Sequence, residues 1–136
     1  MSSADAFSQS ENPTYILFFN EIRIDDVPIV GGKNASLGEM YQQLVPQGVP
    51  VPNGFAVTAE AYRALLSAND LWPKMHELLD GMDAENSVEL QTRGTKLRDL
   101  IYSAQLPDDM YQELCDAYLK LTQEYGDHIS VAVRSS

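Results

Sequence analysis

Cysteine and basic residues are both scarce in this sequence. A single cysteine, Cys115, among 136 residues rules out an internal disulfide and fits a reducing compartment such as the cytoplasm. It falls in a predicted helix with no His/Asp partner, so we expect a buried structural thiol rather than a nucleophile. Only 9 Lys and Arg stand against 20 Asp and Glu, which gives a net charge of −11. This balance argues against nucleic acid and anionic membrane surfaces as partners, because both attract basic residues.

Long hydrophobic runs are absent as well. No segment approaches the ~20 apolar residues of a membrane-spanning helix, so we expect no membrane partner. The N-terminus carries acidic residues but no basic ones, which excludes a signal peptide. We expect residues 1–13 to form a disordered tail. Residues 14–136 are enough for one modest domain, since 44% of the chain is hydrophobic.

Candidate metal ligands and catalytic groups are few. No His/Cys cluster has the spacing of a zinc site, and we expect ordinary structural roles for His76 and His128. Glu39 lies in the middle of a predicted helix, where a solvated carboxylate is the expected role rather than a metal ligand. The sequence therefore predicts no catalytic residue and no metal ligand within this chain.

The hydrophobic pattern predicts an α+β fold with short strands and a helix-rich middle. We expect strands at residues 15–19, 55–57 and 129–134. We expect helices at residues 33–44, 59–68 and 71–79, a longer helix that starts at Asn86, and a last helix between Pro107 and Gly126.

Polar residues stand where several of these helices begin. Thr58 and Asp70 are predicted N-caps, and Asn86 with Glu89 forms a variant of the capping box. The apolar stripes of the middle helices are interpreted as core, although a partner-binding groove stays open as an alternative. For the longer helix the expected buried stripe consists of Leu90, Leu97, Leu100, Ile101 and Ala104.

The most informative stretch is a pair of glycines, Gly31 and Gly32, followed by Lys33 at the start of a predicted helix. Glycine lets the backbone approach a ligand closely, and a helix N-terminus offers unpaired N–H groups and a positive dipole end. Together with the lysine they predict a phosphate site. It is not a P-loop, since Val27 and Asn34 stand where that motif needs Gly and Ser or Thr. A tight turn with a solvated lysine remains the alternative.

Arg134 is the second candidate ligand. It ends the last predicted strand and is followed by two serines. A guanidinium held at a strand end can fork onto phosphate oxygens. The alternative is a solvated arginine where the sheet meets water.

Four segments in the same order resemble one family. They are Phe-Asn-Glu at 19–21, Gly-Gly-Lys-Asn-Ala-Ser-Leu-Gly-Glu-Met at 31–40, Gly-Val-Pro-Val-Pro-Asn-Gly-Phe-Ala-Val-Thr at 48–58, and Val-Ala-Val-Arg-Ser-Ser at 131–136. From Tyr15 onward the chain resembles the N-terminal part of the ATP-binding domain of phosphoenolpyruvate synthases (pyruvate, water dikinases). Asn53, where glycine would be expected, is a small departure that concerns the local loop conformation.

The resemblance implies an ATP-grasp-like nucleotide-binding domain of which this chain is an incomplete N-terminal lobe. The implied reaction converts ATP, pyruvate and water to AMP, phosphoenolpyruvate and phosphate, through a phosphohistidine on another domain. Lys33 and Arg134, with Gly31 and Gly32, would contact the ATP phosphates. Mg²⁺ ligands would lie outside the chain, beyond Ser136.

The implied partners are ATP, pyruvate in the complete enzyme, and the remaining domains of the same polypeptide, and a homodimer is left open. Related dikinases and phosphotransferases with the same lobe are one alternative to the synthase. The other is a non-catalytic, acidic helical module that binds a protein.

Overall fold

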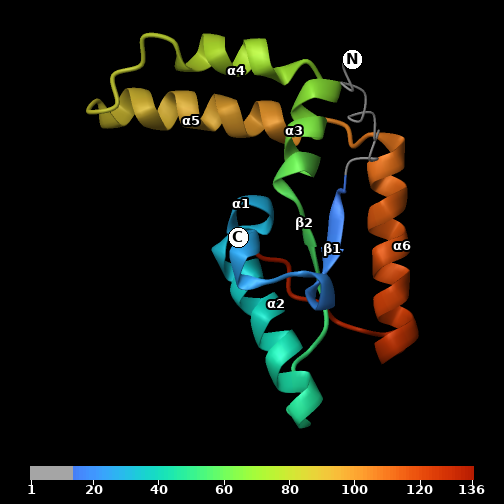
Figure 1. The fold of residues 1–136 in the computed structure, drawn as a ribbon. Coiled ribbons are helices and arrows are strands. Elements are labelled where there is room, and N and C mark those ends of the chain that lie inside the picture. Colours follow the sequence, from blue (N-terminus) through green and yellow to red (C-terminus); the bar gives the residue numbers. More distant parts are fainter. Residues whose placement is uncertain (1–13) are drawn as a thin grey trace, which may run out of the picture.

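The structure is a computed structural model that describes residues 14–136, so the tail expected at residues 1–13 lies outside the described residues. Two short strands, β1 (Ile16–Phe18) and β2 (Phe55–Val57), form an antiparallel pair in which Leu17 lies opposite Ala56. The rest is mainly helical, which confirms the predicted α+β class with a helix-rich middle (Figure 1).

Six α-helices and three 3₁₀ turns accompany the two strands in the described part of the chain. The helices are α1 (Val27–Val30), α2 (Gly32–Leu44), α3 (Ala59–Ala68), α4 (Leu71–Leu79), α5 (Ser87–Tyr102) and α6 (Asp108–Tyr125). The 3₁₀ turns are η1 (Phe19–Glu21), η2 (Ile24–Asp26) and η3 (Val45–Gln47). In Figure 1, α6 runs beside β1, α1 and α2 lie on the other side of the strand pair, and α4 and α5 form an antiparallel pair at one end.

Two small clusters of buried side chains hold these elements together. The first cluster joins the segment between η1 and η2, helix α1 and helix α2 to β2, and consists of Ile22, Val30, Ala35 and Ala56. A second cluster, Tyr15, Ala61 and Met110, joins the residue before β1 to α3 and α6. The first cluster fixes α2, and with it the glycine–lysine stretch, against the strand pair.

Helix α2 packs so closely on the first cluster that one position must be glycine. A Cβ built on Gly38 would lie 2.5 Å from Ile22 Cβ and 2.6 Å from the Ile22 carbonyl oxygen. Real Cβ atoms do not approach backbone atoms this closely, so the helix could not keep its place with a larger residue. The next residue, Glu39, is half-buried and accepts a hydrogen bond from the backbone N–H of Ile24 at 3.2 Å. Its carboxylate, expected to be solvated, is thus partly exposed and also joins α2 to η2.

Two of the three predicted N-caps form. Thr58 is buried, and its Oγ1 accepts from Ala61 N–H at 3.2 Å at the start of α3. Asn86 Oδ1 accepts from Glu89 N–H at 3.1 Å at the start of α5. Asp70 was wrongly predicted to cap α4, because its backbone is left-handed (φ 53°) and its side chain accepts no helix N–H.

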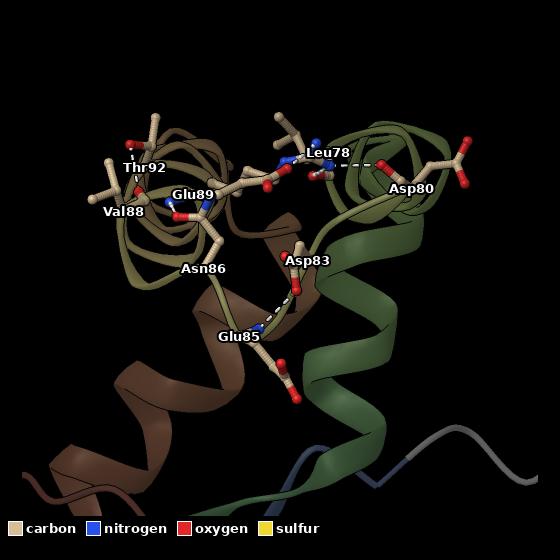
Figure 2. A network of polar contacts seen from close by, with 9 residues as sticks. Leu78, Asp80, Asp83, Glu85, Asn86, Val88, Glu89 and Thr92 are labelled. Atoms are coloured by element: carbon tan, nitrogen blue, oxygen red, sulfur yellow. Dashed lines mark hydrogen bonds and ion pairs between the residues drawn. The ribbon is translucent and has the colours of Figure 1, made fainter.

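The α4–α5 pair is tied together by Arg93 on α5. Its Nη1 donates to the carbonyl oxygens of Leu78 at 3.1 Å and Asp80 at 2.6 Å, where α4 ends. Its Nη2 forms an ion pair with Glu89 at 2.5 Å. Figure 2 shows Leu78, Asp80 and Glu89 beside the loop that contains Asp83 and Asn86. The arginine thus supplies partners for carbonyls that a helix C-terminus leaves unpaired.

Three further expectations need correction. The stripe predicted on α5 is only partly covered, since α5 contains no buried residue and packs mainly on α4. Cys115 lies on α6 as predicted but is half-buried rather than buried. Residues 129–134 do not form a strand. A strand needs a neighbour for its N–H and C=O groups, and β1 and β2 pair only with each other among the described residues.

Candidate functional site

The glycine–lysine stretch forms a sharp junction between two helices. Gly31 ends α1, where its N–H donates to the Val27 carbonyl oxygen at 2.8 Å, and it is also the residue before the first turn of α2. It adopts φ 82°, a region that L-residues other than glycine rarely occupy. This turn directs the N-terminus of α2, with Gly32 and Lys33 exposed on its first turn, toward solvent.

The end of the described chain lies against this N-terminus. Lys33 Nζ donates to the Ser135 carbonyl oxygen at 3.3 Å, and the backbone N–H of Asn34 donates to Ser136 Oγ at 3.3 Å. Each pair is separated by 102 residues in the sequence. In Figure 1 the C-terminal label accordingly lies beside α1 and the start of α2. The structure thus brings together the two segments that carry the predicted ligands, Lys33 and Arg134.

The two glycines have different roles in this contact. A Cβ on Gly31 would overlap the Ser136 hydroxyl and lie 3.0 Å from the Ser136 carbonyl carbon, whereas a Cβ on Gly32 would meet nothing within 4 Å. Glycine is therefore required at position 31 both by its backbone conformation and by the approach of the C-terminal segment. Gly32 leaves open space beside Lys33.

Arg134 is exposed and lies in a segment without regular secondary structure. The expectation that it sits at the end of a strand was wrong. Neither Arg134 nor Lys33 forms an ion pair with a carboxylate within residues 14–136. In a chain of net charge −11, this leaves two uncompensated cations on neighbouring segments. Beside a helix N-terminus, such an arrangement can bind an anion with several oxygens, such as a polyphosphate.

The sequence did not predict that Asn34 and Ser136 take part in the contact between the C-terminal segment and α2. Their contact joins distant segments, so no local spacing predicts it. Asn34 also donates from Nδ2 to the Val30 carbonyl oxygen at 3.0 Å, which ties the first turn of α2 back to α1. The identical serines after Arg134 gave no indication of which would reach the helix.

Neither a cluster of metal-ligating side chains nor a hollow coincides with the glycine–lysine stretch in the described residues. Within residues 14–136, no group of three or more His, Cys, Asp or Glu residues is placed to hold a metal ion.

A hollow of about 670 Å³ lies between α1 and α3, away from the glycine–lysine stretch, and its walls include Pro28, Ile29 and Arg63. It contains neither Lys33 nor Arg134. In the described part of the chain no helix has the length and apolar character needed to cross a membrane.

The chain is similar to known proteins over most of its length. Residues 27–136 match the family model described as pyruvate phosphate dikinase, AMP/ATP-binding domain. The chain is 42% identical over 130 residues to a phosphoenolpyruvate synthase of Aquifex aeolicus, covering 95% of this chain and 15% of that protein. It is 46% identical over 123 residues to the synthase of Helicobacter pylori, covering 90% and 15% respectively. It is 36% identical over 129 residues to the synthase of Escherichia coli, covering 95% of this chain and 16% of that protein. The chain therefore spans about 15% of the length of these curated relatives.

Proposed function

Because the chain belongs to the pyruvate phosphate dikinase AMP/ATP-binding domain family, we propose that it forms one lobe of the ATP site of a phosphoenolpyruvate synthase. The observation that carries this proposal is the contact between Lys33 and Ser135, which brings the segment of Arg134 to the N-terminus of α2. Residues 14–136 would be the N-terminal lobe, and the rest of the ATP-grasp-like domain would come from elsewhere in the protein.

The two basic residues would act differently on the nucleotide. Lys33 is a mobile point charge on the first turn of a helix, so it would exchange its weak contact with the Ser135 carbonyl for phosphate oxygens. Arg134 would hold phosphate oxygens with its planar fork and offset charge that develops during transfer. Gly31 and Gly32 would keep side chains out of the space between them.

The complete reaction would convert ATP, pyruvate and water to AMP, phosphoenolpyruvate and phosphate, with phosphate carried on a histidine of another domain. Pyruvate would bind outside this lobe. Mg²⁺ would offset charge on the phosphates, and its ligands would also come from outside, since the described residues lack a suitable cluster. A cytoplasmic location and a homodimer are part of the same proposal.

Replacing Lys33 tests this proposal in the complete natural protein. We expect Lys33→Ala to reduce ATP- and pyruvate-dependent AMP formation at least ~100-fold, because a charge that acts on the transferring phosphate is lost. The matched control is Lys96→Ala, which removes an exposed lysine from α5. The measurement compares the rates of AMP release by the two variants with saturating pyruvate. Equal rates for the two variants would contradict the role given to Lys33.

A further inference from the structure

Asn53, just before β2, is fastened to the last turn of α6. Its backbone N–H donates to Tyr125 Oη at 2.7 Å, and its Nδ2 donates to Glu124 Oε2 at 2.9 Å. Its Oδ1 accepts from Gly54 N–H at 2.9 Å, so the orientation of the carboxamide is fixed from both sides. We call Asn53, Glu124 and Tyr125 the α6 latch.

The latch holds the last turn of α6 by polar contacts. The buried residues of α6 are Met110, Ala117 and Leu121, and none lies in the last turn, residues 122–125. Burial, followed by the charges of Glu124 and Tyr125, raises the pKa of Tyr41 on α2 above its ordinary value. The latch hydrogen bonds join the end of α6 to the segment before β2.

The segment that carries Arg134 starts directly after the latch. Gly126, with φ 99°, ends α6 and turns the chain. After a turn at residues 127–128, Ile129 is half-buried, and residues 130–134 form no hydrogen bond with any other residue of the described part of the chain. The next contacts are those of Ser135 and Ser136 with the start of α2. Hydrogen bonds thus hold the far end of the segment on α2, and the latch holds the helix end from which the segment departs.

We propose that Asn53 is a positioning residue for the nucleotide site, because the latch fixes the point from which the Arg134 segment departs. This inference rests on the proposed function, since it requires Arg134 to bind phosphate. When the start of a short segment is fixed, less chain entropy is lost on bringing its far end to α2. A loosened latch leaves Lys33 and the phosphate chemistry unchanged, but Arg134 is in place for a smaller fraction of the time. The loss falls on ATP affinity rather than on the rate at saturation.

The test uses a reversed hydrogen bond in the complete natural protein. Asn53→Asp places a second carboxylate against Glu124 and removes the Nδ2 donor, so we expect the Kd for ATP to rise roughly fivefold. Adding Glu124→Gln to that variant restores one donor and one acceptor with their direction exchanged, while the acceptor for Gly54 N–H is retained. We expect the Kd of the double variant to return to within about twofold of wild type.

Asn69 provides the matched control at the opposite end of α6. Its Nδ2 donates to the carbonyl oxygens of Leu65 and Gln105, and its Oδ1 accepts from Gln105 N–H at 3.0 Å. Asn69→Asp should lower the melting temperature but leave the Kd for ATP unchanged. Wild-type affinity in Asn53→Asp would overturn the inference. So would equal weakening by Asn69→Asp, or a folded double variant that stays weak. If the wild-type protein binds no ATP, the proposed function fails first, and the inference fails with it.

Discussion

At the scale of single residues, the glycines of the motif differ in what they permit. Gly31 (φ 82°, ψ 164°) is in direct contact with Ser136, whereas Gly48 (φ 84°, ψ 8°) has open space around its Cβ position. Gly48 is therefore a control for a positive φ without contact to the C-terminal segment.

We expect Gly48→Ala to lower the free energy of unfolding by ~1 kcal/mol and Gly31→Ala by about 2 kcal/mol, because only glycine readily adopts the backbone conformation of Gly31. Only Gly31→Ala should also weaken ATP binding, by roughly tenfold, because its Cβ displaces Ser136 and with it the segment of Arg134. Chemical denaturation and ATP titration of both variants measure the two effects separately. Equal ATP affinities would mean that the contact between Gly31 and Ser136 does not matter for the nucleotide.

The sequence predicted two of three local N-caps and missed the contacts between distant segments. Thr58 and Asn86 were recognised as caps because a cap and its helix lie within three residues of each other. Asn53 was noted only as a departure from an expected glycine. Its partners lie 71 and 72 residues away, on a different helix, and no short pattern encodes such a contact.

At the scale of elements, two helix glycines distinguish packing from propensity. Gly38 on α2 faces Ile22 at a distance that leaves no room for a side chain. Gly94 on α5 is in a helix as well, but a Cβ there would meet only the Arg98 guanidinium at an ordinary 3.5 Å. Substitution by alanine should therefore change the free energy of unfolding in opposite directions at the two positions.

We expect Gly38→Ala to destabilise the protein by about 2 kcal/mol, because α2 must move away from Ile22. Gly94→Ala should stabilise it by about 1 kcal/mol, because alanine favours a helix interior over glycine. Urea unfolding followed by circular dichroism measures both changes. A stabilising Gly38→Ala would show that α2 does not pack on Ile22 as described.

Most elements follow from patterns within a few residues, and the exceptions depend on packing. Helices α3 and α4 were predicted with their observed bounds from capping and apolar spacing. The short helix α1, which has Pro28 in its first turn, was not predicted. The strand expected at residues 129–134 failed because alternating Ile, Val and Val supplies strand propensity but no pairing partner.

At the scale of the whole molecule, the sequence predicted the family and the candidate site residues. The contact between the C-terminal segment and α2 is visible only in the structure. The resemblance to phosphoenolpyruvate synthases, drawn from four short segments, is confirmed by the family match over residues 27–136. The approach of the Arg134 segment to α2 depends on the path of residues 126–136 across the molecule, which no motif describes. Whether Lys33 and Arg134 bind one ligand together is a prediction about that arrangement.

ATP affinity in a double-mutant cycle tests this directly. Equilibrium titration of the complete natural protein would compare wild type, Lys33→Ala, Arg134→Ala and the double variant, with Lys96→Ala as the control. We expect each single substitution to raise the Kd for ATP at least ~10-fold, and the double variant to lose less than the product, because both cations hold one phosphate chain. Unchanged affinity in both single variants would contradict the assignment of this lobe as the ATP site.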